Sequence, residues 1–227
     1  VGRRMHMEFE LNPWKAAKIA DVGDVPFPRA NDNEACIEEI TRFYTKIDQA
    51  GARPISVGGD HSITGGIVQA IGCGNITGGE PVCFLHLDAH TDVFTKVDHF
   101  LGAKKSAAHW GAYLADQGKV DPTHSMQIGL RGHARTLDWL EPSYEYGYNV
   151  VTMKEFRKRG IEDVVAQIKD VMQRAFWDIL SEQLAARDAQ LSELKKAKFE
   201  LGEQLRGEKD KRRSAEKALK LAEKQVS

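Results

Sequence analysis

Three side chains that could bind a metal ion follow one short apolar run of the sequence. Asp88, His90 and Asp92 stand two residues apart, directly after the run at 82–87. In an extended segment this spacing directs all three side chains to one side of the chain. Two carboxylates held so close would repel each other unless one took up a proton or a cation lay between them. The spacing therefore indicates a site for a divalent metal ion.

A further candidate ligand follows the preceding apolar run. His61 belongs to the sequence Gly-Gly-Asp-His-Ser at 58–62, directly after the run at 54–57. The two glycines allow a sharp turn of the backbone, and sites in parallel sheets form where strands end. We therefore expect His61 to reach Asp88 and Asp92. Carboxylates and imidazoles without thiolates favour Mn²⁺, Zn²⁺, Fe²⁺ or Ni²⁺ over soft metals.

Each segment also has a structural interpretation. The segment at 88–92 could be an ordinary polar loop, and His61 could be a hydrogen-bonded histidine of the core. His86, two residues before Asp88 on the same strand face, is expected to be such a core histidine. The combination of both segments at successive strand ends favours the metal site.

Apolar periodicity places these segments in an α/β fold with a parallel sheet. Strands are expected at 18–22, 54–57, 82–87, 126–130 and 149–152, and helices at 33–50, 62–71, 107–117 and 161–172. The strand at 82–87 is apolar on both faces, which is typical of a strand buried in a parallel sheet. The alternation of strands and helices indicates right-handed βαβ units.

The composition excludes several classes of protein. Hydrophobic residues make up 41% of the 227 residues, charged residues 29%, and the net charge is −1. These values argue against a disordered chain and against a dedicated partner of nucleic acids or of membrane surfaces. The three cysteines show no zinc-finger or disulfide pattern. We therefore expect a cytoplasmic protein with neither nucleic acid nor membrane as partner.

The average composition hides a boundary near residue 175. All seven prolines lie at or before Pro142 and all eight histidines at or before His133, whereas 22 of the last 52 residues are charged. We therefore expect two parts, an α/β domain at 1–175 and a helical coiled-coil segment at 176–227.

The second part carries a heptad repeat that begins with Trp177 at position a. The a series is Trp177, Leu184, Leu191, Lys198, Leu205, Arg212, Leu219 and Val226, and the d series is Leu180, Arg187, Leu194, Leu201, Glu208, Ala215 and Ala222. Eleven of these 15 positions are apolar, which predicts a coiled coil and favours a homo-oligomer. A solvated single helix is the alternative.

The paired motifs resemble those of the ureohydrolases, the arginase and agmatinase superfamily. Gly-Gly-Asp-His-Ser-Ile-Thr at 58–64 and Leu-Asp-Ala-His-Thr-Asp at 87–92 carry the resemblance. The segments at 19–25, 50–64 and 121–132 resemble agmatinase-type members more than arginases. The resemblance extends from about residue 12 to about residue 171. It implies a three-layer fold with a parallel sheet, here incomplete and followed by a long helix.

The resemblance also implies an activity, the release of urea from a linear guanidino compound such as agmatine or guanidinobutyrate. In that superfamily two Mn²⁺ ions activate a water molecule. By motif, His61, Asp88 and Asp92 would bind one ion, and Asp88 and His90 the other. His109 would correspond to a histidine that shuttles protons or contacts substrate; a surface histidine at a helix start is the alternative. No substrate-binding residue can be assigned.

One motif of the superfamily, S-x-D-x-D-x-x-D-P, has no counterpart here. It should follow the helix at 161–172, but residues 173–177 lead into the heptads, and no Asp-x-Asp pair occurs after Asp92. Both ions would therefore lack ligands, so that one ion or none is the alternative to two. Three functions stay open: an active hydrolase, an inactive truncated remnant with an assembly segment, and a binder of one metal ion.

Overall fold

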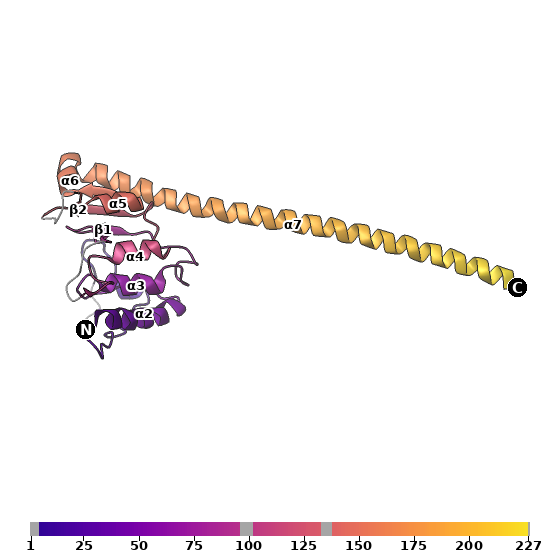
Figure 1. Cartoon of the computed structure of the whole chain (residues 1–227), viewed down its shortest axis with the longest axis horizontal. Coiled ribbons are helices and arrows are strands. Elements are labelled where there is room, and N and C mark those ends of the chain that lie inside the picture. Colours follow the sequence, from indigo (N-terminus) through magenta and orange to yellow (C-terminus); the bar gives the residue numbers. More distant parts are fainter. Residues whose placement is uncertain (1–4, 96–101, 133–137, 227) are drawn as a thin grey trace. The chain divides into compact units, whose positions relative to one another are not determined.

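The computed structural model describes residues 5–95, 102–132 and 138–226 (Figure 1). The chain divides into two compact units, Val1–Glu162 and Asp163–Ser227. The boundary predicted near residue 175 lies inside one continuous helix, α7 (Ile161–Val226). The change in composition is therefore not accompanied by a break in secondary structure.

The first unit is built on a parallel sheet of three strands in the order β1-β2-β3. The strands are β1 (Leu85–Leu87), β2 (Met126–Leu130) and β3 (Asn149–Thr152). All five residues of β2 are buried, because this strand has a neighbour on each side. The predicted α/β class with a parallel sheet is confirmed, and so are the strands at 126–130 and 149–152.

Three helices that precede or connect the strands lie one beyond another on the same side of the sheet (Figure 1). They are α2 (Asn33–Gln49), α3 (Ile63–Ile71) and α4 (Trp110–Asp116). The helix α2 begins at a capping Asp32, whose side chain accepts a hydrogen bond from the backbone N–H of Ala35. These helices confirm the predictions at 33–50 and 62–71, and α4 is a shorter form of the helix expected at 107–117.

The close packing of α2 on α3 depends on a glycine. A Cβ atom on Gly66 would lie 2.7 Å from Cγ2 of Ile40, which is itself almost fully buried. Beyond α3, an apolar cluster fills the space between the helices and the sheet: Val68, Val93, Trp110, Ala112, Leu114, Val120 and Tyr148. This cluster supports the carboxyl end of β1, where the candidate site lies.

Two predicted strands are not formed, and a third is shorter than expected. Residues 18–22 and 54–57 have no regular structure, and the side chains of Ile55 and Val57 are almost fully exposed. The run at 82–87 forms a strand only at Leu85–Leu87, and Leu85 and Leu87 are exposed rather than buried. A strand needs a hydrogen-bonded neighbour, and in the described residues β1 has one only on its β2 side.

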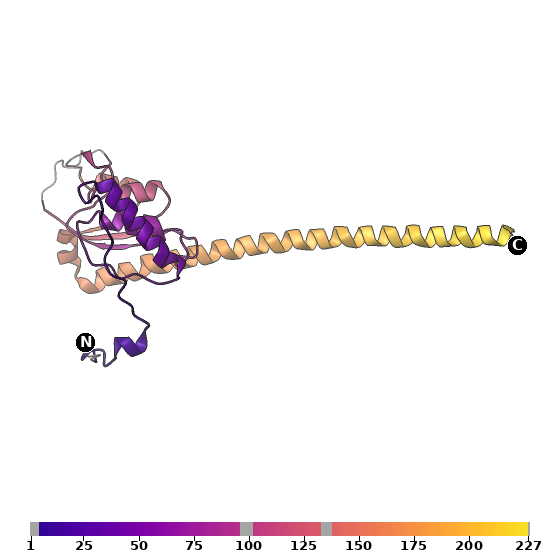
Figure 2. The same ribbon diagram turned by 90° about the horizontal axis from the view of Figure 1, so that it is seen from below.

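Three short helices were not predicted: α1 (Pro13–Ala16), α5 (Glu141–Tyr146) and α6 (Met153–Arg159). The helix α6 begins with a capping box, in which Thr152 and Glu155 satisfy each other's backbone N–H groups. The helical character predicted for 161–172 and 176–227 is confirmed over 161–172 and 176–226, since both belong to α7 (Figure 2), and residue 227 lies outside the described residues. Among the described residues, no helix combines the length and apolar character that crossing a membrane requires.

Candidate metal centre

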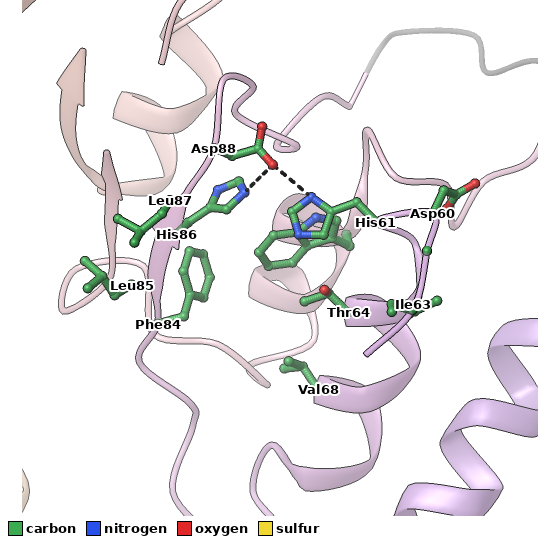
Figure 3. Close-up of a pocket in the computed structure, with 13 residues that line it drawn as sticks. Asp60, His61, Ile63, Thr64, Val68, Phe84, Leu85, His86, Leu87 and Asp88 are labelled. Atoms are coloured by element: carbon green, nitrogen blue, oxygen red, sulfur yellow. Dashed lines mark ion pairs between the residues drawn. The ribbon is translucent and has the colours of Figure 1, made fainter. Parts of the chain in front are cut away.

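A cleft of about 510 Å³ opens beside the carboxyl end of β1 (Figure 3). One wall is the loop that carries His61, and the other is the strand segment 84–88. Phe84 and Val68 line an apolar part of the cleft, while His61, His86 and Asp88 gather at one end of it (Figure 3). The volume lies in the range of pockets that bind small molecules in proteins.

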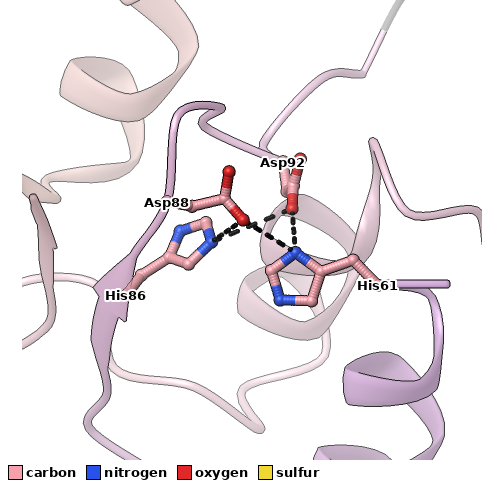
Figure 4. A group of neighbouring side chains, drawn as sticks. All are labelled: His61, His86, Asp88 and Asp92. Atoms are coloured by element: carbon pink, nitrogen blue, oxygen red, sulfur yellow. Dashed lines mark ion pairs between the residues drawn. The ribbon is translucent and has the colours of Figure 1, made fainter. Parts of the chain in front are cut away.

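Four side chains converge at the polar end of this cleft (Figure 4). His61, His86, Asp88 and Asp92 each offer a ligand atom, and these atoms all lie within 4.8 Å of one another. His61 precedes α3, His86 lies on β1, and the two aspartates follow β1. The predicted convergence of His61 with Asp88 and Asp92 is therefore present in the structure.

Most distances within this cluster match those between the ligands of a single ion, and the one between His61 and Asp92 is shorter because these two side chains are hydrogen-bonded. Nδ1 of His61 lies 2.6 Å from Oδ2 of Asp92 and 3.3 Å from Oδ2 of Asp88. Nε2 of His86 lies 3.6 Å and 3.8 Å from the same two oxygens. Ligand atoms bound to one ion at about 2.1 Å lie roughly 3 to 4 Å apart. The four side chains therefore need only small shifts to enclose a cation.

His86 departs from its predicted role as a hydrogen-bonded core histidine. Its side chain is buried as expected, but neither ring nitrogen has a hydrogen-bond partner. Its ring packs between Phe84 and Trp110, with the nearest carboxylate oxygen, on Asp88, 3.6 Å away. A buried unpaired polar group is costly, and a bound cation would give Nε2 a partner. The His-x-Asp spacing on one strand face was the available signal.

Asp92 is held in place by the start of α4. The indole N–H of Trp110 donates a 3.0 Å hydrogen bond to Oδ2 of Asp92, and the backbone N–H of Gly111 donates to its carbonyl oxygen. Asp92 has a positive φ of 52°, so the chain turns sharply after the ligand segment. Trp110 also lies against the rings of His61 and His86, with centroids 5.2 Å and 5.1 Å away. Sequence reasoning missed this positioning role of Trp110.

The protonation equilibria of the cluster differ from residue to residue. The hydrogen bond to Asp92 raises the pKa of His61, against the opposing effect of burial. Burial lowers the pKa of His86 and so favours the neutral imidazole, the form that binds metals. Burial alone would raise the pKa of Asp88, but the backbone N–H of His90 and the nearby imidazoles hold it below its ordinary value.

The two remaining predicted site residues lie outside the group of four. The side chain of His90 is exposed, with Nδ1 3.3 Å from Oδ1 of Asp88, the oxygen that faces away from His61. His109 is buried at the start of α4, where Nδ1 lies 2.8 Å from Oγ of Ser106. The alternative of a surface histidine for His109 is therefore wrong. A second ion at His90 and a proton-transfer role for His109 stay predictions.

Fold and cluster together define a parallel α/β protein with a candidate divalent-metal site at the end of a strand. Residues 2–177 match the model of the arginase family. The chain therefore belongs to the arginase family, as the paired motifs predicted.

Two curated relatives illustrate the similarity in sequence. A guanidinopropionase from Pseudomonas aeruginosa is 30% identical over 172 residues, which are 75% of this chain and 51% of that protein. The mitochondrial guanidino acid hydrolase of Homo sapiens is 32% identical over 160 residues, 70% of this chain and 43% of that protein. The chain thus spans about half the length of the relatives it matches.

Solved structures show the same fold. A proclavaminate amidino hydrolase from Streptomyces clavuligerus superposes with a TM-score of 0.62 at 24% identity, over 74% of this chain and 53% of that one. A hypothetical agmatinase from Burkholderia thailandensis gives a TM-score of 0.60 at 24% identity, over 74% and 48% of the two chains. The α/β unit therefore corresponds to about half of a family domain.

Proposed function

We propose that this chain binds one Mn²⁺ ion at His61, His86, Asp88 and Asp92 and acts as an amidinohydrolase on a linear guanidino compound. The observation that carries the proposal is the convergence of these four side chains at one end of a cleft, in a chain of the arginase family. Relatives named for guanidinopropionate, guanidinobutyrate and agmatine support the substrate class.

The four residues fit a divalent cation chemically. Two carboxylates supply negative charge, and two imidazoles supply neutral donors, a mixture that suits Mn²⁺. Both ring nitrogens of His86 lack a hydrogen-bond partner, so Nε2 is available to a cation. Trp110 orients the carboxylate of Asp92 by donating its indole N–H to Oδ2, the oxygen that lies near His61 and His86, as outer-shell groups do for metal ligands.

A bound Mn²⁺ would lower the pKa of a water molecule and so supply a nucleophile at neutral pH. The chain's own residues would place the substrate. The cleft beside the cluster is apolar at Phe84 and Val68, which suits the short alkyl chain of a linear guanidino compound. Asp88 would attract the guanidinium group with its second carboxylate oxygen, and His109 is the proposed proton-transfer residue.

A second candidate function is metal binding without turnover. It is favoured by the position of His90, which is exposed and lies outside the group of four ligands. It is also favoured by the length of the matched region, about half of each relative. In this case the α/β unit would retain one ion but lack the groups that complete a hydrolytic site.

One experiment separates the two functions. The purified chain is titrated with Mn²⁺ by calorimetry, and urea release is measured with 3-guanidinopropionate, 4-guanidinobutyrate, agmatine and arginine. Binding of one ion with urea release from one of these compounds supports the hydrolase. Binding of one ion without urea release supports the metal-binding function. Absence of Mn²⁺ binding would contradict both.

A further inference from the structure

The helix α7 carries an exposed apolar stripe that follows the heptad repeat. Along positions a and d, the side chains of Leu184, Leu191, Leu194, Leu201 and Leu205 are each at least half exposed. In proteins, most of the stability of a helix comes from the packing of its apolar face, and an apolar stripe with a heptad period is typical of a helix that packs against another helix. We therefore expect the stripe to pack against another helix, and the charged residues within the stripe restrict the orientation of that helix.

Charged residues interrupt the stripe at Arg187, Lys198, Glu208 and Arg212. In a parallel coiled coil with both helices in register, each of these residues would face its own copy. Four layers of the interface would then hold two like charges each. Such contacts are destabilising, and most so where water is excluded. The parallel arrangement of two copies is therefore disfavoured.

An antiparallel arrangement removes much of this conflict. In antiparallel coiled coils an a position of one helix faces a d position of the other. The register that sets Lys198 opposite the partner's Glu208 also sets Leu201 opposite the partner's Leu205. Twofold symmetry makes each contact occur twice. Lys198, Glu208, Leu201 and Leu205 are all exposed in the single chain, so they are free to make these contacts.

We propose that α7 forms an antiparallel homodimer with a second copy of this chain, centred near Glu203 and in the register that pairs Lys198 with the partner's Glu208. The pattern continues outward: Leu191 lies opposite the partner's Ala215, and Leu194 packs against the alkyl part of the partner's Arg212. At the edge of the interface, Lys195 lies near the partner's Lys209. This like-charge contact is solvent-exposed and weak beside the paired charges within the stripe.

The proposal is tested on the full chain by exchanging the two charges. Sedimentation equilibrium gives the dimer dissociation constant of the wild type, of Lys198→Glu, of Glu208→Lys and of the double variant. Each single variant sets two like charges against each other at two places and is expected to weaken dimerisation roughly tenfold or more. The double variant restores opposite charges and is expected to dimerise about as tightly as the wild type.

Mixing supplies an independent check. An equimolar mixture of Lys198→Glu and Glu208→Lys chains is expected to form heterodimers preferentially, because both contacts then join opposite charges. Lys196→Glu is the matched control, since it makes the same charge change at an f position away from the stripe. Three results would overturn the proposal. In the first, both single variants have the dimer dissociation constant of the wild type, and in the second, the double variant dimerises as weakly as either single variant. In the third, the wild-type chain stays monomeric at all concentrations.

Discussion

Replacement of His86 by leucine tests the metal centre most directly, because two measured quantities are expected to move in opposite directions. In the metal-free protein, the buried ring nitrogens of His86 have no hydrogen-bond partner. A buried polar group without a partner costs about 1 to 3 kcal/mol. Leucine fills a similar volume between Phe84 and Trp110 without that cost. The metal-free His86→Leu variant is therefore expected to be more stable than the wild type by about 1 kcal/mol or more.

The same change removes one of four ligand atoms. We expect the dissociation constant of Mn²⁺ to rise at least tenfold, which corresponds to about 1.4 kcal/mol. At a Mn²⁺ concentration of 100 times the wild-type dissociation constant, the wild type should gain about 2.7 kcal/mol of stability from the metal. A variant that binds ten times more weakly should gain only about 1.4 kcal/mol at the same concentration.

Urea unfolding with and without Mn²⁺ measures both effects, and calorimetry gives the affinity directly. His90→Leu is the matched control for the four-residue site, because it makes the same chemical change on an exposed side chain. It is expected to leave the affinity of this site within a few-fold of the wild type. A His86→Leu variant that binds Mn²⁺ as tightly as the wild type, and is less stable without metal, would show that His86 is only a core residue.

Three further outcomes are expected. Gly66→Ala should lower the free energy of unfolding by about 1 to 2 kcal/mol in urea unfolding, because the new Cβ would lie 2.7 Å from Cγ2 of Ile40 and overpacking outweighs the gain in helix propensity. Burial alone would raise the pKa of Asp121, but hydrogen bonds to its carboxylate hold the pKa below its ordinary value. Its contribution to stability should therefore be present above about pH 4 and disappear as the pH falls through the folded pKa; a difference between wild type and Asp121→Asn that stays constant down to pH 2 would contradict this. Burial, with a smaller effect of the Asp121 charge, raises the pKa of Cys83 to about 11, so iodoacetamide at pH 8 should alkylate the exposed Cys73 well before Cys83, as followed by peptide mass spectrometry.

Local patterns in the sequence were sufficient to predict the helices α2 and α3 and three of the four side chains in the candidate metal site. The apolar spacing along 33–50 predicted α2, since Ile37 and Ile40 are indeed buried on one face. The Gly-Gly turn and the alternate spacing of Asp88 and Asp92 predicted their meeting with His61. The helix depends on residues close together in the chain, and the meeting of His61 with the two aspartates follows from the rule that sites in parallel sheets form where strands end.

Strands were harder to predict, because a strand depends on a neighbour that local sequence does not contain. Residues 18–22 and 54–57 have strand-like composition, yet no described segment pairs with them. For the same reason Leu85 and Leu87 are exposed, although the apolar run at 82–87 predicted a strand buried on both faces. The long helix was predicted in two pieces, and only the structure shows that α7 runs through the compositional boundary.

The sequence by itself determined which residue types could bind a metal, where they stand relative to predicted strand ends, and which charges interrupt the heptads of the last segment. The tertiary structure decided which of those side chains meet. It brought His86 into the cluster, because β1 directs that ring toward Asp88 and the core closes around it without a hydrogen-bond partner. It left His90 exposed, although its spacing from Asp88 is equally short. Spacing along a chain restricts side-chain directions, but only packing against α3 and α4 selects among them.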